Sequence, residues 1–161
     1  MPNQSPDLTI FAPGGVFNLR VGAVILRRDQ VLLVNNGLHY YSIGGRVKLH
    51  ETLEQAVKRE IMEETGEIFE VDRLLWINEG FFTLKGGAYD GQRFHEISFI
   101  FLMKPKPDTK IGNGCVLKDD AKEWLEWVPI DELGNHIVYP EIIKTDLRRL
   151  PDQPVHIVKI E

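Results

Sequence analysis

Residues 52–66 carry the pattern of an amphipathic helix together with glutamates that this pattern alone does not explain. The apolar stripe of the predicted helix consists of Leu53, Ala56, Val57 and Ile61. At about 100° per residue, Glu60 and Glu64 fall within the arc of that stripe, and Glu63 lies at its border. Two acidic side chains are therefore expected to point toward the interior of the protein.

The inward direction of Glu60 and Glu64 requires a positive partner. Removing a carboxylate from water costs several kcal/mol unless a positive charge lies beside it. Arg59 can neutralise one of these charges, but not three carboxylates together. Divalent cations prefer hard oxygen ligands of this kind. The helix therefore predicts a metal ion held in a cleft.

Both ends of this helix are specified by local signals. Thr52 and Gln55 have the S/T-x-x-E/Q spacing of a capping box, which satisfies backbone N–H groups at a helix start. Gly66 suits the left-handed position just beyond a helix end. The boundaries of the helix are thus predicted independently of its apolar stripe.

The rest of the chain alternates β-rich runs with polar turns, which predicts an α/β fold with a mixed sheet. The expected strands cover residues 17–27, 30–34, 40–43, 67–77, 81–84, 94–104, 123–130 and 156–160. The strand over 40–43 is expected to stop at Gly44, and residues 78–80 to separate two strands. A second helix is expected over 140–150, with Pro140 at its first position.

Length and composition fit one domain over 1–161, with residues 1–15 as a loose lead-in. The net charge of −5 and the lack of a Lys/Arg run argue against nucleic-acid binding. No signal peptide and no run of membrane-spanning length is visible, and the single Cys115 cannot form an internal disulfide. We therefore expect a cytoplasmic protein that binds neither nucleic acid nor membrane. The apolar run 17–26 could pair across a homodimer or lie within the sheet.

From Gly45 to Gly66 the chain reads G-x5-E-x7-R-E-I-M-E-E-T-G. This pattern resembles the signature box of the Nudix (MutT-like) hydrolases, G-x5-E-x7-R-E-U-x-E-E-x-G-U, where U is a bulky aliphatic residue. The matching residues are Gly45, Glu51, Arg59, Glu60, Ile61, Glu63, Glu64 and Gly66. The one departure is Glu67, which replaces the last aliphatic residue and concerns the packing beneath the helix end.

The resemblance implies a Nudix-type α/β/α sandwich with a loop-helix-loop metal-binding motif. It also implies a pyrophosphohydrolase that uses Mg²⁺ or Mn²⁺ to cleave a nucleoside diphosphate linked to another group. Bound cations screen the charge of the diphosphate, acidify a water molecule and stabilise the leaving phosphate. By the same resemblance Glu60 and Glu64 are the chief metal ligands, Glu63 shares an outer ion or orients water, and the carbonyl of Gly44 is a further ligand.

Arg59 and Glu51 each have two interpretations. Arg59 either forms an ordinary surface pair with Glu63 or, as in the family, directs its guanidinium toward the box carboxylates and fixes them. Glu51 either adds favourable charge at the helix start or stabilises the loop before it, where it could also assist the metal. With Glu63, these residues complete the predicted catalytic set.

Gly45 and Arg46 are predicted to contact the substrate, because a residue without a side chain lets the backbone approach a phosphate closely. The sequence does not decide which residue is the base that activates water. The candidates are Glu63 within the box and Asp119, Asp120 and Glu123 outside it, with His95 and Glu96 as weaker ones.

The substrate is the least determined feature of the sequence. Residues 82–84 carry neither the Pro nor the Tyr that marks family members selective for ADP-ribose or dinucleoside polyphosphates. The short segment before the first strands also leaves little room for the extra N-terminal domain of many ADP-ribose pyrophosphatases. We therefore favour a nucleoside triphosphate or a dinucleoside polyphosphate. The alternative to an enzyme is a catalytically silent Nudix-fold module that senses a nucleotide or sugar phosphate.

Overall fold

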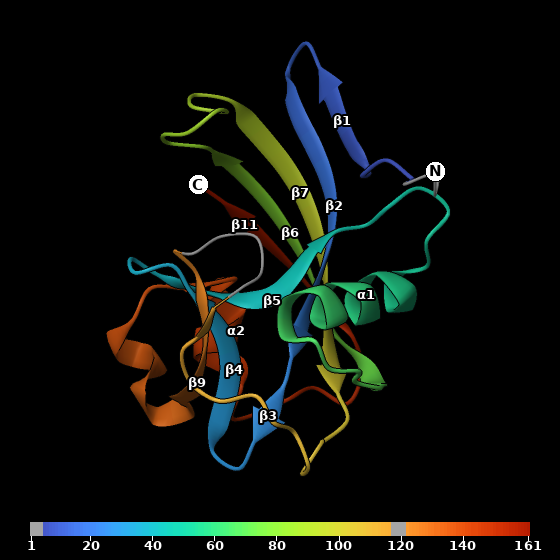
Figure 1. Cartoon of the computed structure of the whole chain (residues 1–161). Coiled ribbons are helices and arrows are strands. Elements are labelled where there is room, and N and C mark those ends of the chain that lie inside the picture. The colour runs from blue at the N-terminus through green and yellow to red at the C-terminus, as the bar shows by residue number, and fades with distance from the viewer. Residues whose placement is uncertain (1–4, 117–121) are drawn as a thin grey trace.

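The computed structural model describes residues 5–116 and 122–161 (Figure 1). The strands found there are β1 Thr9–Ala12, β2 Gly15–Val24, β3 Leu26–Arg27, β4 Gln30–Asn35, β5 Tyr40–Arg46, β6 Val71–Thr83, β7 Arg93–Met103, β8 Cys115–Val116, β9 Trp124–Pro129, β10 Val138–Tyr139 and β11 Val155–Ile160. The helices are α1 Leu53–Thr65 and α2 Glu141–Asp146, with a 3-10 helix, η1, over Ile130–Asn135. None of the helices in these described ranges is long and apolar enough to cross a membrane.

The strands form one mixed sheet in the order β11-β6-β7-β2-β5-β4-β9-β8. Strand β5 joins the two parts of this sheet. Its residues 43–46 pair with 20–23 of β2, and its residues 40–42 pair with 33–35 of β4. Since β2 pairs with both β7 and β5, the apolar run 17–26 lies largely inside the sheet instead of at a free edge.

Helices cover the two faces of the sheet, which confirms the α/β/α sandwich (Figure 1). On one face, α1 buries Ala56, Val57 and Ile61 against a cluster that includes Val21 and Ala23 of β2. The other face carries a second apolar cluster, which includes Ile143 of α2 together with Val24, Trp76 and Ile100. Alternate residues of β2 therefore point into different cores, as the period of two along a strand requires.

The predicted ends of α1 are confirmed. The side chain of Thr52 accepts a hydrogen bond from the N–H of Gln55, and the side chain of Gln55 accepts one from the N–H of Thr52. Gly66 adopts φ 75°, the left-handed conformation that ends the helix. The capping box fixes the orientation of the first turn and thereby the direction of the carboxylates two turns later.

Two predicted breaks in the strands were wrong. Strand β5 continues through Gly44 and Gly45 to Arg46. Gly44 is required there by close packing, because a Cβ on it would lie 2.1 Å from the carbonyl oxygen of Val21. Similarly, β6 continues through residues 78–80 as one strand. At Gly44, glycine therefore marks a close backbone approach and not a turn.

The two ends of the chain also differ from expectation. Residues 9–12, within the expected loose lead-in, form β1 and pair with residues 15–18 of β2. The second helix is shorter than 140–150. It begins after Pro140, which is its N-cap, and ends at Asp146.

Candidate functional site

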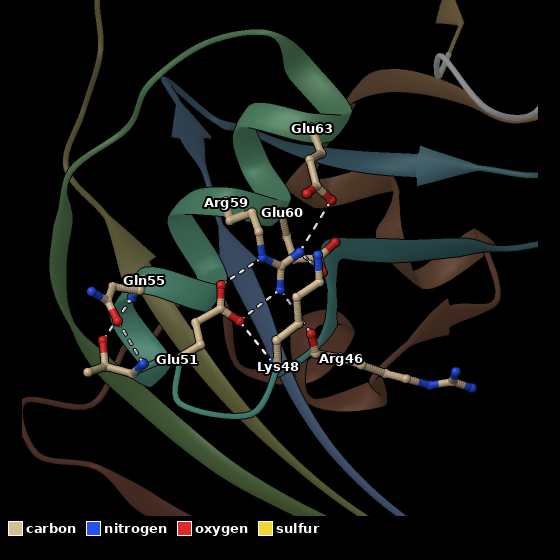
Figure 2. Close-up of polar contacts among 8 residues, drawn as sticks. Arg46, Lys48, Glu51, Gln55, Arg59, Glu60 and Glu63 are labelled. Atoms are coloured by element: carbon tan, nitrogen blue, oxygen red, sulfur yellow. Dashed lines mark hydrogen bonds and ion pairs between the residues drawn. The ribbon is translucent and has the colours of Figure 1, made fainter. Parts of the chain in front are cut away.

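Arg59 is the centre of a network of charged groups that joins α1 to the loop before it (Figure 2). Its Nε and Nη2 donate to the two carboxylate oxygens of Glu51, at 2.7 and 2.9 Å. Its Nη1 donates to Glu60 at 2.6 Å and to Glu63 at 3.3 Å. Its Nη2 also donates to the backbone carbonyl of Arg46 at 3.0 Å. The guanidinium thus ties three carboxylates to the end of β5, and its surface pair with Glu63 is only one part of the network.

Glu51 closes the loop between β5 and α1. Besides its two-pronged contact with Arg59, it accepts a hydrogen bond from the N–H of Lys48 at 3.0 Å. Burial alone would raise the pKa of Glu51, but Arg59 and the Lys48 N–H outweigh it and hold the pKa below its usual value. The hydrogen bonds of Arg59 to Glu51 and Glu60 raise the pKa of Arg59 above its usual value, although its burial opposes this. Of its two interpretations, the contacts of Glu51 fit stabilisation of the loop.

Glu60 lies over Gly45. Its carboxylate occupies the space that the side chain of any residue other than glycine would need at position 45. A Cβ on Gly45 would lie 2.5 Å from the carboxylate carbon and both oxygens of Glu60. Burial raises the pKa of Glu60, Arg59 opposes this, and the neighbouring Glu63 adds to it. The lack of a side chain at Gly45 therefore leaves the space into which the carboxylate of Glu60 fits.

Glu64 is the carboxylate of this site whose negative charge is most strongly disfavoured by its surroundings. Its Oε1 accepts a long hydrogen bond of 3.4 Å from the N–H of Gly44, and its Oε2 is buried without a hydrogen-bond partner in the described structure. Burial raises the pKa of Glu64 to about 8, the Gly44 N–H opposes this, and the nearby charges of Glu60 and Glu123 add to it. A negative charge at this position needs a cation that no described side chain supplies in full.

A divalent cation fits these residues by two observations. The unpartnered Oε2 of Glu64 is a free hard ligand in a buried place, and Glu60 offers a second carboxylate one helical turn away. Glu63 is mostly exposed and lies at the rim. Within residues 5–116 and 122–161, no three His, Cys, Asp or Glu side chains already stand around one point that would hold an ion. A cation there would therefore need water or backbone oxygens besides the carboxylates of α1.

The candidate bases outside the box are separated by position. Glu123 lines the same cavity as Glu64, is close enough to raise its pKa, and accepts a hydrogen bond from the hydroxyl of Tyr41 at 3.4 Å. His95 is paired with Glu79 at 2.8 Å and does not line this cavity. Asp119 and Asp120 lie outside the described residues.

A cavity of about 1130 Å³ extends from Glu64 and Gly44 across one face of β2, β7 and β6. Arg46 lines it, together with Tyr41, Phe81 and Phe82, and its contact with a substrate stays a prediction. Its floor also contains polar residues whose part in the site the sequence did not indicate: Asn18, Arg20, Asn78 and Ser98, beside Glu96. The signal was the spacing of two between Asn18 and Arg20 within an apolar strand, which puts both side chains on one face.

The departure from the Nudix pattern at Glu67 has a structural explanation. Glu67 accepts a hydrogen bond from the N–H of Lys110 at 2.6 Å and lies 3.4 Å from the ammonium of Lys106. Lys106 in turn donates to the carbonyl of Ile68. An acidic residue at this position therefore fastens the loop after β7 to the end of α1, where the pattern has an aliphatic contact.

Solved structures with this fold include Nudix proteins. The chain is similar to a MutT protein from Bacillus halodurans, with 22% identity, a TM-score of 0.57 and coverage of 88% of this chain and 90% of that one. A MutT NUDIX hydrolase from Burkholderia pseudomallei matches with 20% identity, a TM-score of 0.54 and coverage of 81% and 98%. These likenesses define the fold, which is the Nudix fold.

The family follows from the sequence itself. The model of the NUDIX domain matches residues 16–148, which is most of the chain, so this protein belongs to the NUDIX family. A curated relative, an ADP-ribose pyrophosphatase from Methanocaldococcus jannaschii, is 35% identical over 112 residues. That match covers 64% of this chain and 57% of the relative, so the two are aligned over little more than half of the relative's length.

Proposed function

We propose that this protein is a pyrophosphohydrolase that requires a divalent cation, Mg²⁺ or Mn²⁺, and cleaves a nucleoside diphosphate linked to another group. The observation that carries the proposal is the buried, unpartnered Oε2 of Glu64, a residue that lines a large cavity and lies one helical turn from Glu60. Membership of the NUDIX family supports it, since these hydrolases generally use divalent metal ions. When bound, the cation supplies charge screening and a more acidic water molecule.

In this proposal Glu60 and Glu64 hold the cation, with Glu63 at the rim and the backbone oxygen of Gly44 as further ligands. Arg59 and Glu51 are positioning residues, because their mutual contacts fix the direction of Glu60 without reaching the cavity themselves. Removing Arg59 would leave buried carboxylates without their internal counter-charge. The loop and the helix would then lose their common anchor.

Glu123 is the residue we favour as proton acceptor for the attacking water. It reaches the cavity from the start of β9, opposite α1, and is held by the Tyr41 hydroxyl. A base must lie within hydrogen-bond reach of the water that it activates, and Glu123 shares the neighbourhood of Glu64. Glu63 stays the alternative within the box.

For the substrate, the cavity is large enough for a nucleotide with a second group attached. The expectation of a nucleoside triphosphate or dinucleoside polyphosphate stays a prediction. The relative named ADP-ribose pyrophosphatase makes ADP-ribose the first compound to compare with them. A protein without turnover, as in the sensor alternative, would bind such compounds and leave them intact.

The proposal is tested by incubating the protein with ADP-ribose, nucleoside triphosphates and dinucleoside polyphosphates, with and without Mg²⁺, and measuring the released phosphate species. We expect hydrolysis of at least one compound that depends on the cation. Glu64→Gln should lower kcat by about a thousandfold or more, because it removes a metal ligand. Glu54→Gln, on the exposed first turn of the same helix, is the matched control and should keep parental activity.

Two results would contradict this proposal. Parental turnover in a folded Glu64→Gln variant would exclude Glu64 as a metal ligand. Binding of these compounds without hydrolysis, at any cation concentration, would favour the sensor module instead.

A further inference from the structure

Three neighbouring strands place a group of polar side chains on the floor of the cavity. In the register of the sheet, Glu96 of β7 stands beside Asn18 of β2, and Ser98 stands beside Arg20. Arg20 in turn stands opposite Arg46 of β5. These residues are on the face of β2 opposite to the one that α1 covers, and all of them line the cavity that Glu64 also reaches.

Arg20 and Arg46 form a pair of like charges that the protein itself does not neutralise well. Directly opposed like charges on antiparallel strands are destabilising. Among the described residues, the ionic partner of Arg20 is Glu96 at 4.0 Å, and that of Arg46 is the half-exposed Asp7 at 3.6 Å. Neither contact is the close two-pronged pair that arginine forms with an anion that fits it. The pair is therefore suited to bind an anion that enters the cavity.

Arg46 is held in place for this role by the box itself. The carbonyl of Arg46 accepts a hydrogen bond from Arg59, the same side chain that orients Glu60. Arg20 and Arg46 line the same cavity as Glu64. An anion on the arginine pair would consequently lie beside the predicted cation, as the second phosphate of a diphosphate must.

Glu96 is a carboxylate whose orientation is fixed by neutral groups. Its Oε2 accepts a hydrogen bond from the side-chain amide of Asn18 at 3.3 Å, and its Oε1 accepts one from the hydroxyl of Ser98 at 3.4 Å. Asn18 is itself buried and accepts a hydrogen bond from the hydroxyl of Thr9. A carboxylate held open toward a cavity in this way repels phosphate and accepts hydrogen bonds from donors.

We propose that Arg20, Arg46 and Glu96 form a subsite for a ribosyl phosphate, in which the arginine pair binds the phosphate and Glu96 accepts hydrogen bonds from the vicinal hydroxyls of the ribose. This inference rests on the proposed function and specifies its substrate: a diphosphate that carries an unmodified ribose next to a phosphate. Deoxyribose compounds lack part of the donor pair that Glu96 requires. A site built to bind a hydroxyl discriminates strongly against the analogue that lacks it.

The closeness of Arg20 to Glu96 favours ribose over a nucleobase as the group that Glu96 contacts. In a ribose 5-phosphate the hydroxyls lie one sugar ring away from the phosphate, whereas the edge of a base lies beyond the sugar. The two charged groups are 4.0 Å apart, so a ligand that contacts both must carry its anion and its donors close together. The ribosyl phosphate that binds here is either the nucleoside part of the substrate or a sugar at its other end. Both present a phosphate beside the hydroxyls of a ribose.

The test measures equilibrium binding with four probes in the presence of Mg²⁺: AMP, 2′-deoxy-AMP, ribose 5-phosphate and 2-deoxyribose 5-phosphate. We expect the parent to bind at least one ribose compound about tenfold or more tightly than its deoxy counterpart. Glu96→Gln should reduce that ratio toward one. Arg20→Ala and Arg46→Ala should weaken the binding of a ribose compound and of its deoxy counterpart by a similar factor. The ratio between the two affinities should therefore stay unchanged. The AMP arm and the ribose 5-phosphate arm distinguish the two sources of the sugar.

Matched controls come from β6, the neighbour of β7 in the same sheet. Glu79→Gln removes another half-buried carboxylate of the sheet, with the same 21% side-chain exposure as Glu96, but Glu79 pairs with His95 and His156 away from this cavity. Arg73→Ala is the counterpart of Arg20→Ala, with side-chain exposures of 34% and 38%. Both controls should bind all four probes as the parent does. If Glu96→Gln does not fold, Glu96→Asp replaces it in the test. The shorter side chain keeps the negative charge but moves it away from the ribose hydroxyls, so this variant should also lower the ratio of ribose to deoxyribose binding.

An unchanged ratio in Glu96→Gln, or no preference for ribose in the parent, would overturn the subsite. Inorganic phosphate serves as a fifth, reference probe, and if it bound as tightly as AMP and ribose 5-phosphate, that result would overturn the role of Glu96. Because the readout is binding, these outcomes are independent of turnover. A protein that binds the probes with the expected preference but hydrolyses nothing would contradict the proposed function and leave the subsite standing.

Discussion

At the scale of single residues, Glu67 illustrates how a departure from a family pattern can be compensated. The aliphatic residue in the pattern contributes apolar contact beneath the helix, whereas Glu67 contributes ionic and hydrogen-bond contacts to the loop 104–113. Burial alone would raise the pKa of Glu67, but the Lys110 N–H, the Thr109 side chain and Lys106 together hold it below its usual value of 4.5. Its charge is therefore stabilised by folding.

The consequence is a pH dependence with a definite sign. A carboxyl whose pKa is lower in the folded state adds stability above its unfolded pKa, and this contribution is lost as pH falls through the folded pKa. Glu67→Gln should lower the free energy of unfolding by about 1–3 kcal/mol at pH 7. The difference from the parent should shrink as pH falls below 4.5, the usual value for the unfolded chain. Urea unfolding at several pH values measures this, with the exposed Glu54→Gln as control. A pH-independent difference would contradict the assigned role of Glu67.

Sequence periodicity predicted the inward direction of Glu60 and Glu64 because both share the helix face of the core residues. It could not predict the cavity floor. Asn18, Arg20 and Glu96 are brought together by strands whose paired residues are 78 positions apart in the chain, and their register depends on the whole sheet. The sequence also left two roles open for Glu51, because its hydrogen bond to Arg59 depends on how the loop before α1 folds back onto the helix.

At the scale of elements, β5 is the strand on which the site depends. It leaves β2 for β4 within a few residues, and its two adjacent glycines meet different neighbours. Gly44 faces the backbone of β2, while Gly45 faces the carboxylate of Glu60. The sequence indicated that both glycines matter, but it placed them after the strand. Glycine usually weakens a strand, and the close approach that requires it here is a tertiary feature.

These two glycines predict different effects of the same substitution. Gly44→Ala puts a Cβ 2.1 Å from a backbone oxygen that cannot move freely, so it should strongly destabilise the fold. Gly45→Ala meets the end of the Glu60 side chain at 2.5 Å, which can shift. It should therefore reduce activity by about tenfold or more while lowering the melting temperature much less. Thermal unfolding and kcat of the two variants check this. Equal losses of stability would contradict the distinction.

At the scale of the whole molecule, β5 passes from one part of the sheet to the other, and residues of both parts line the cavity, Arg20 and Glu96 in one part and Val34 and Tyr139 in the other. Helix α1 contributes the carboxylate of Glu64 to this cavity, and β2 and β7 contribute charges of both signs along its floor. The fold class was predictable because the box, the strand runs and the turns agreed with one another. The added β1 was not, although it forms a hairpin with β2, because most of its residues are exposed and do not mark a core-facing strand. The continuity of β6 was not either, because residues 78–80 have the composition of a turn.

The central claim is that a divalent cation binds between the carboxylates of Glu60 and Glu64, and anomalous diffraction from crystals soaked in Mn²⁺ tests it most directly. We predict an anomalous peak within coordination distance of at least one oxygen of each carboxylate. The peak should disappear from crystals of Glu64→Gln and persist in those of Glu54→Gln. Parent crystals with both side chains unchanged and no peak beside them, at a Mn²⁺ concentration that supports hydrolysis, would contradict the claim.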